Sequence, residues 1–114
     1  HAVFPPRARR GRGVAVMPGS VVNGLSRIGD GAISNTGATV DHDCDIGRCA
    51  HVAPGTNVAG NVVIGEGVFL GIGSRVLPSV TVGAWTTVGA GAVVTTNLPG
   101  GVTAIGVPAM VREK

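Results

Sequence analysis

One aliphatic side chain recurs at every sixth position from Val16 to Val94, and only Ser34 interrupts the series. A period of six fits neither an amphipathic helix, which repeats near 3.6 residues, nor a half-buried strand, which alternates about every two residues. It is typical of a solenoid built from very short strand-and-turn units. The sequence therefore predicts an all-β chain in which each unit packs on its neighbours in a stack.

A second period gives the length of one coil of this stack. The pairs Ile28-Gly29, Ile46-Gly47, Ile64-Gly65 and Val82-Gly83 are spaced by eighteen residues, so three six-residue units make one coil. Strands rise about 3.3 Å per residue and lie about 4.8 Å apart, so coils bent at three corners stack directly on one another. We expect a single-stranded, triangular, parallel β-helix with 18 residues per coil and almost no helix.

The interior of such a coil is narrow, and the composition agrees with this. Four residues after each aliphatic position comes a second column of mostly small residues: Ser20, Ser26, Ala32, Ala38, Cys44, Ala50, Thr56, Val62, Val68, Ser74 and Val80. Only three residues are aromatic, whereas 20 of 114 are glycine. Glycine suits tight corners that need positive φ or close backbone approach. Both columns are therefore predicted to fill the core.

The repeats divide the chain into three parts. We assign residues 14–96 to the β-helix, residues 1–13 to a basic N-terminal segment or cap, and residues 97–114 to a C-terminal cap and tail. The run Asn97-Leu98-Pro99-Gly100-Gly101 indicates a turn, after which Val102–Val107 is expected to form one more strand.

The basic character of the chain is local. The formal net charge is +3, but without Arg7, Arg9, Arg10 and Arg12 five basic residues would face six acidic ones. Nucleic-acid binding would call for a basic stripe over the folded surface, which this pattern lacks. There is no secretory apolar region and no run of eighteen apolar residues, so we expect neither export nor a membrane span. A cytoplasmic protein with reduced cysteines is expected.

Residues whose side chains could take part in catalysis or binding cluster in one coil, Ser34–His51. It contains two of the three histidines, both cysteines and three of the six acidic residues. An isolated histidine is usually an ordinary surface group. The clustering instead favours a functional site in this coil.

Within this coil, His42 follows the interior Val40 by two residues and is expected to project from a corner. Its stacking neighbours eighteen residues away are Gly24 and Gly60, which would leave space beside the ring. An exposed imidazole titrates near neutral pH and can act as a general base, and the adjacent Asp43 could fix its tautomer.

The neighbouring corner carries a second candidate pair. Asn35 and His51 lie there, and Gly71 and Gly89 continue the column of Asn35. We expect a groove along this column that could hold a long, thin ligand.

Four residues that could bind a metal ion occur close together in the sequence: His42, Cys44, Cys49 and His51. Cys44 belongs to the interior column, whereas Cys49 shares a turn column with Gly31, Gly67 and Trp85. Because these side chains should not converge, the pattern disfavours both a zinc site and a disulfide, and we expect no metal.

Several motifs together resemble the hexapeptide-repeat acyltransferases, and within them the sugar acetyltransferases of the sialic-acid and bacillosamine type. The motifs are the six-residue repeats, the run from Asn35 to Cys44, the stretches His51–Gly55 and Ala59–Val62, and the closing Gly106-Val107-Pro108-Ala109. The resemblance implies a left-handed coil, although the general rule for parallel crossovers favours the right-handed one. It also implies a homotrimer with active sites between subunits and acetyl-CoA as the co-substrate.

The same resemblance implies roles for individual residues. His42 matches the catalytic base and Asp43 the carboxylate that polarises it, where close relatives usually have Glu. Asn35 matches a polar active-site residue. The positions that match acetyl-CoA contacts are His51, Ile72 and Ala90, and Gly60 matches a backbone amide that receives the oxyanion.

The implied activity is acetyl transfer to an amine or hydroxyl of a small acceptor, a sugar or nucleotide-sugar. The related enzymes carry an N-terminal nucleotide-binding α/β domain that holds this acceptor, and no such domain is present in this sequence. Two other interpretations stay open. A non-catalytic trimeric scaffold would tolerate His42 without needing it, and a γ-class carbonic anhydrase would need three zinc-binding histidines where the repeats offer only His42 and His51.

Overall fold

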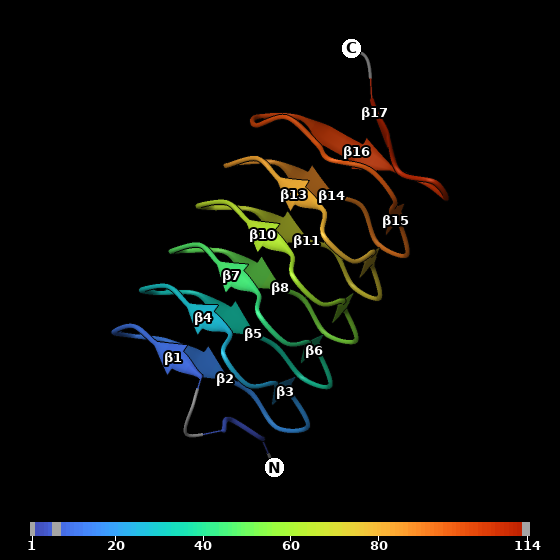
Figure 1. Ribbon diagram of the computed structural model, residues 1–114. Helices are drawn as coiled ribbons and strands as arrows, with labels where there is room; N and C mark the ends of the chain where they lie inside the picture. Colours follow the sequence, from blue (N-terminus) through green and yellow to red (C-terminus); the bar gives the residue numbers. More distant parts are fainter. Residues whose placement is uncertain (1, 6–7, 113–114) are drawn as a thin grey trace.

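The computed structural model describes residues 2–5 and 8–112, and these residues form a left-handed parallel β-helix (Figure 1). The chain climbs coil by coil from the N-terminal to the C-terminal end of the stack. Seventeen strands of two or three residues are present, and the described residues contain no helix. The predicted fold class is confirmed.

Three parallel sheets form the sides of the triangular coil. Side 1 consists of β1 (Arg9–Arg10), β4 (Arg27–Ile28), β7 (Asp45–Ile46), β10 (Val63–Ile64) and β13 (Thr81–Val82). Side 2 consists of β2 (Ala15–Val16), β5 (Ile33–Ser34), β8 (His51–Val52), β11 (Phe69–Leu70), β14 (Thr87–Val88), β16 (Thr103–Ile105) and β17 (Met110–Val111). Side 3 consists of β3 (Val21–Val22), β6 (Thr39–Val40), β9 (Asn57–Val58), β12 (Arg75–Val76) and β15 (Val93–Val94).

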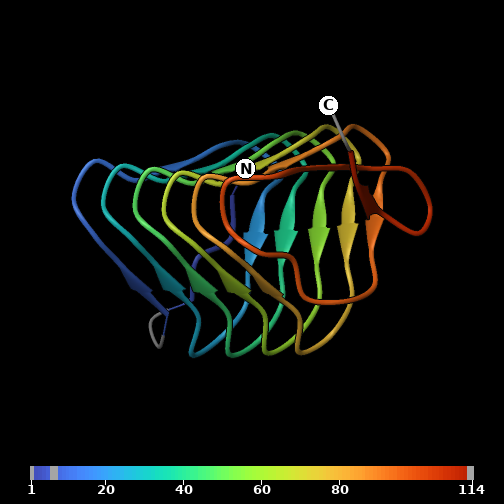
Figure 2. The ribbon, with the colours of Figure 1, turned by 90° about the horizontal axis from the view of Figure 1, so that it is seen from above.

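From β1 to β15, strands on each side pair in parallel at a register of eighteen residues, whereas β16 pairs with β14 at a register of sixteen, Thr87 opposite Thr103. On side 1, Ile46 lies opposite Ile28 on one edge and opposite Ile64 on the other. Figure 2 shows strands of two sides as rows of parallel arrows in chain order. The eighteen-residue period of the sequence therefore places chemically equivalent residues directly above one another.

The core consists of the two columns that the repeat predicted. Ile28, Ile46 and Ile64 are each 1% exposed, and the column of small residues is buried throughout. Ser34, the one break in the aliphatic series, is also buried, and its hydroxyl lies 2.6 Å from the hydroxyl of Ser20. This hydrogen bond satisfies both buried polar groups, so the coil tolerates the interruption.

The corners combine positive φ with close contact between coils. Among the residues that the structure describes, ten glycines and six other residues, including Asp43 and Asn61, have positive φ. Gly65 is required for a different reason: a Cβ atom there would lie 2.6 Å from the backbone nitrogen of Ala84 in the next coil. The coils therefore stack backbone to backbone at this corner.

The two ends of the stack are built differently. At the N-terminal end, β1 pairs with β4 and so extends side 1 into the segment assigned to residues 1–13, while Arg7 of that segment lies outside the described residues. At the C-terminal end, β16 falls within the predicted strand Val102–Val107 and pairs with β14. The antiparallel β17 beside β16 was not expected. The division into residues 1–13, 14–96 and 97–114 stays a prediction.

Within residues 2–5 and 8–112, no helix long and apolar enough to cross a membrane occurs.

Candidate functional site

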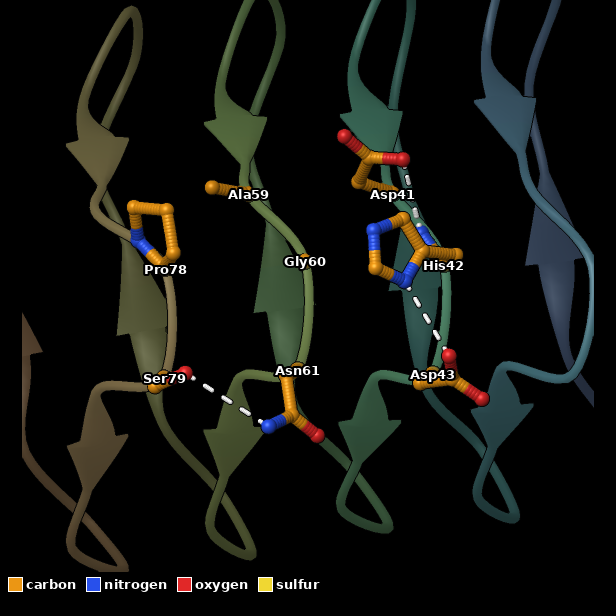
Figure 3. A pocket seen from close by; sticks show the side chains of 8 residues that line it. All are labelled: Asp41, His42, Asp43, Ala59, Gly60, Asn61, Pro78 and Ser79. Atoms are coloured by element: carbon orange, nitrogen blue, oxygen red, sulfur yellow. Dashed lines mark hydrogen bonds and ion pairs between the residues drawn. The ribbon is translucent and has the colours of Figure 1, made fainter.

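A surface pocket of about 530 Å³ opens at the corner between sides 3 and 1. Three successive coils line it, through Asp41, His42, Asp43, Ala59, Gly60, Asn61, Pro78 and Ser79 (Figure 3). Because equivalent positions stack every eighteen residues, a short sequence motif in one coil meets the corresponding corners of the next two. The pocket is the place where the predicted catalytic residues lie.

His42 projects from this corner as expected, with its side chain 63% exposed. The ring leans toward the following coil: a Cβ atom on Gly60 would lie 2.6 Å from its Nε2 atom. At Gly24, in the preceding coil, nothing lies within 4 Å of the corresponding position. The space predicted on both sides of the ring is therefore open on only one side, because the imidazole itself fills the other.

Asp43 turns back toward the imidazole and contacts it on the opposite ring nitrogen. Its Oδ2 lies 3.1 Å from His42 Nδ1. Asp43 has a positive φ of 56°, so the local turn carries its side chain to this position. With Nδ1 donating to the carboxylate, Nε2 keeps its lone pair and faces Gly60. Aspartate is therefore long enough to reach the ring.

Asp41 also lines the pocket, although no role was predicted for it from the sequence. Its Oδ1 accepts hydrogen bonds from the His42 backbone N–H at 2.8 Å and from Asn23 Nδ2 at 3.1 Å. These two hydrogen bonds, the backbone one first, lower the pKa of the Asp41 carboxyl below its ordinary value. The sequence feature that could have indicated a role for Asp41 in the pocket is its position next to His42, opposite Asp43.

Gly60 presents a backbone amide to the same pocket. Among the described residues, no acceptor pairs with its N–H group. A free N–H beside a general base can receive a developing oxyanion. The geometry is compatible with the role implied by the resemblance, which stays a prediction.

The second candidate pair, Asn35 and His51, also comes together. Asn35 Nδ2 lies 3.0 Å from His51 Nε2, and the His51 ring meets the Phe69 ring edge-on with centroids 5.1 Å apart. An amide NH₂ only donates, so Nε2 must accept and the ring proton must sit on Nδ1. His51 is thereby fixed as one tautomer, with its Nδ1–H available to a ligand.

Ile72 and Ala90 stack in adjacent coils at the corner between sides 2 and 3. Both are exposed, Ile72 to 62%. The open space predicted at Gly71 and Gly89 is not present, however, and the groove along this corner stays a prediction. A Cβ atom on Gly71 would lie 2.7 Å from the backbone nitrogen of Ala90, and one on Gly89 would lie 2.8 Å from Ile105 Cγ2. These glycines permit close contact between coils.

The two groups of candidate residues lie at different corners of the coil. His42, Asp43 and Gly60 share the corner between sides 3 and 1. Ile72 and Ala90 lie at the corner between sides 2 and 3, with Asn35 and His51 close to it. One chain therefore does not bring the proposed base together with the positions that match acetyl-CoA contacts.

The two cysteines point in different directions, as the repeat phase predicted. Cys44 is buried and its thiol donates to the carbonyl of Ala59 at 3.0 Å, whereas Cys49 is exposed at a turn. Burial raises the pKa of the Cys44 thiol.

Comparison with known proteins agrees with this geometry. The family model described as bacterial transferase hexapeptide (six repeats) matches residues 61–96. No curated protein sequence matches the chain. Among solved structures, PerB from Caulobacter crescentus in complex with CoA and GDP-perosamine is 55% identical, with a TM-score of 0.97 over 98% of this chain.

Two further structures extend the similarity. The acetyltransferase domain of PglB from Neisseria gonorrhoeae, in complex with acetyl coenzyme A, is 42% identical with a TM-score of 0.96 over 97% of this chain. WeeI from Acinetobacter baumannii is 29% identical with a TM-score of 0.82 over 98% of this chain. The chain spans about half of each structure: 54% of PerB, 54% of the PglB chain and 58% of WeeI. The chain is a hexapeptide-repeat β-helix similar to acetyltransferases that act on sugars, as its motifs implied.

Proposed function

We propose that this protein transfers an acetyl group from acetyl-CoA to the amine of a small acceptor, a sugar or nucleotide-sugar. One observation carries the proposal: an exposed imidazole, held at Nδ1 by a carboxylate, directs its other nitrogen into a pocket beside a free backbone amide. Supporting it is the similarity to PerB, which was solved with CoA and GDP-perosamine. The cytoplasmic location expected from the sequence is part of the proposal.

The reaction is a direct transfer without an acyl-enzyme. His42 Nε2 accepts a proton from the acceptor amine as its nitrogen attacks the thioester carbonyl. The Gly60 N–H donates to the oxygen that becomes negatively charged in the tetrahedral intermediate. Asp43 keeps the second proton of the imidazolium on Nδ1 and stabilises its charge. CoA then leaves as a thiolate, which needs little acid assistance because thiols have a pKa of about 8.5.

The proposed site requires more than one chain. The base and the positions that match acetyl-CoA contacts lie at the two corners that border side 3. If three copies pack with side 3 toward a common axis, the corner that carries His42 in one copy meets the corner that carries Ile72 and Ala90 in the next. A cyclic homotrimer with three equivalent clefts is therefore part of the proposal.

The proposal is tested by release of free CoA from acetyl-CoA in the presence of GDP-perosamine, the sugar nucleotide bound in PerB. We expect acceptor-dependent release together with a product heavier by one acetyl group. Acetyl-CoA alone is expected to raise the thermal midpoint of the protein, because a ligand that binds only the folded state stabilises it. Light scattering is expected to report three chains per particle. The proposed activity would be excluded if acetyl-CoA does not stabilise the protein and the protein does not accelerate acetyl transfer from acetyl-CoA to any amino-sugar.

A further inference from the structure

The pocket around His42 has an anionic wall. Among the described residues, those that line it include two carboxylates, Asp41 and Asp43, and no arginine or lysine. Figure 3 shows the two carboxylates on opposite sides of the imidazole ring. Asp43 contacts Nδ1, on the side of the ring away from Gly60. Asp41 is thus the carboxylate that this arrangement leaves for a ligand.

Only one of the two Asp41 oxygens is used within the protein. Oδ1 accepts from the His42 backbone N–H and from Asn23. No hydrogen bond of the described residues involves Oδ2. The hydrogen bonds to Oδ1 also keep the pKa of the group low, so the carboxylate is charged at neutral pH. A half-buried, charged and partly unpaired carboxylate beside a general base is suited to bind a cation.

The proposed acceptor arrives as such a cation. Amines comparable to an α-amino group have a pKa of about 8, so most of the acceptor is ammonium at neutral pH. Ammonium has no lone pair and cannot attack a thioester. An enzyme that binds the charged form has to remove one proton from it before the nitrogen can attack.

We propose that Asp41 selects the acceptor: its free oxygen pairs with the ammonium group of the sugar and holds that nitrogen beside His42 Nε2. This inference rests on the proposed function and adds the residue that distinguishes an amine from a hydroxyl. The ammonium first loses one proton to solvent. The amine nitrogen then forms the new C–N bond, its second proton moves to His42 Nε2, the C–S bond breaks, and the thiolate takes the proton from the imidazolium.

A purely structural role for Asp41 predicts a different behaviour. Its contacts to the His42 backbone and to Asn23 need only an acceptor oxygen, and the carboxamide of asparagine supplies one at the same place. Asp41→Asn therefore removes the charge and keeps the local turn. Asp45→Asn is the matched control, because Asp45 is an exposed carboxylate on side 1 of the same coil and lies outside the pocket.

The test measures equilibrium binding by calorimetry of the amino-sugar acceptor and of its analogue with a hydroxyl in place of the amine. In Asp41→Asn we expect the Kd for the amino-sugar to rise about tenfold or more, as loss of a charged hydrogen bond predicts. The Kd values for the hydroxyl analogue and for acetyl-CoA are expected to stay unchanged, as are all three in Asp45→Asn.

Three results would overturn the role of Asp41: an unchanged Kd for the amino-sugar, an equal loss for the amine and the hydroxyl analogue, or no binding of the amino-sugar to the wild type. Turnover is measured separately on the same proteins. If amine binding depends on Asp41 but the wild type transfers no acetyl group, the proposed function fails and the binding role stands. If the wild type transfers acetyl groups but Asp41→Asn binds and uses the amine normally, only this inference fails.

Discussion

The His42 ring is positioned by one contact at each of its two nitrogens. Asp43 holds Nδ1 at 3.1 Å, and the absence of a side chain on Gly60 gives the Nε2 edge its place above the next coil. Because the side chain projects from the stack, it contributes nothing to the core columns. Function and stability can therefore be separated by substitution at this position.

His42→Ala is expected to lower turnover by roughly 10² to 10⁴, the usual effect of removing a positioned acid or base. Acetyl-CoA binding and the thermal midpoint should change little. Asp43→Asn should cost less, because it weakens the orientation and basicity of the ring without deleting the proton acceptor. Steady-state CoA release at several pH values measures both effects. Full activity of His42→Ala would show that His42 is an ordinary surface histidine without a catalytic role.

The two thiols are expected to differ in reactivity. Cys44 is buried and its pKa is raised, so at neutral or mildly alkaline pH it is less often a thiolate than an ordinary cysteine. Titration of the native protein with a thiol reagent should modify Cys49 rapidly and Cys44 only after denaturation. Cys49→Ser is the control, which should abolish the fast phase. Two equally fast thiols would contradict the interior position of Cys44.

At this scale the sequence predicted which residues meet but not how their side chains turn. The repeat phase placed His42 outside and Cys44 inside, and both positions are confirmed. It could not distinguish Gly24 from Gly60 as the neighbour of the ring, because both are glycines eighteen residues from His42. The hydrogen bonds of Asp41 were missed for the same reason, since spacing fixes the backbone and leaves the rotamer open.

At the corners of the coil, glycines in the same column have different surroundings. Gly60→Ala would place a methyl group against the His42 ring, whereas Gly24→Ala meets nothing within 4 Å and neither residue has positive φ. We expect Gly60→Ala to displace the imidazole and to lower kcat about tenfold or more, within the range that proton transfer contributes. Gly24→Ala should keep wild-type turnover.

The comparison is made by steady-state kinetics with thermal midpoints recorded in parallel. A loss of activity in Gly60→Ala with the fold retained supports the contact. Equal activity of the two alanine variants would contradict the ring position described above.

The strands could be predicted almost completely because each one obeys the same local rule. Sixteen of the strands belong to the parallel stack, and the hydroxyl pair Ser20 and Ser34 explains the single break in the pattern. β17 could not be predicted, since Met110–Val111 has no equivalent one coil earlier and pairs in the antiparallel sense. The open space expected at Gly71 was wrong, because a glycine can mark either open space or close backbone contact between coils.

The whole molecule is a rod of 42 × 21 × 20 Å, and its narrow width is consistent with the proposal that the active site takes residues from more than one chain. In the described residues, buried side chains fill the interior of the coils. The candidate residues lie on two separate corners that border side 3. Packing of side 3 around an axis would join these corners between neighbouring copies. The proposed cleft is thus a property of the assembly.

In the proposed assembly, each active site takes His42 from one chain and its acetyl-CoA contacts from another. Mixed assemblies of two variants, His42→Ala and Ala90→Glu, test this arrangement. Ala90 is exposed, so the glutamate leaves the core intact while its bulk and charge oppose CoA. Each variant alone is expected to be nearly inactive.

When the two variants are co-produced, every cyclic trimer that contains both of them has one intact cleft among its three, or about one third. We therefore predict CoA release at about one third of the wild-type rate per chain, measured on particles purified through a different tag on each variant. Mixed particles that contain both chains and regain no activity would contradict an active site shared between subunits.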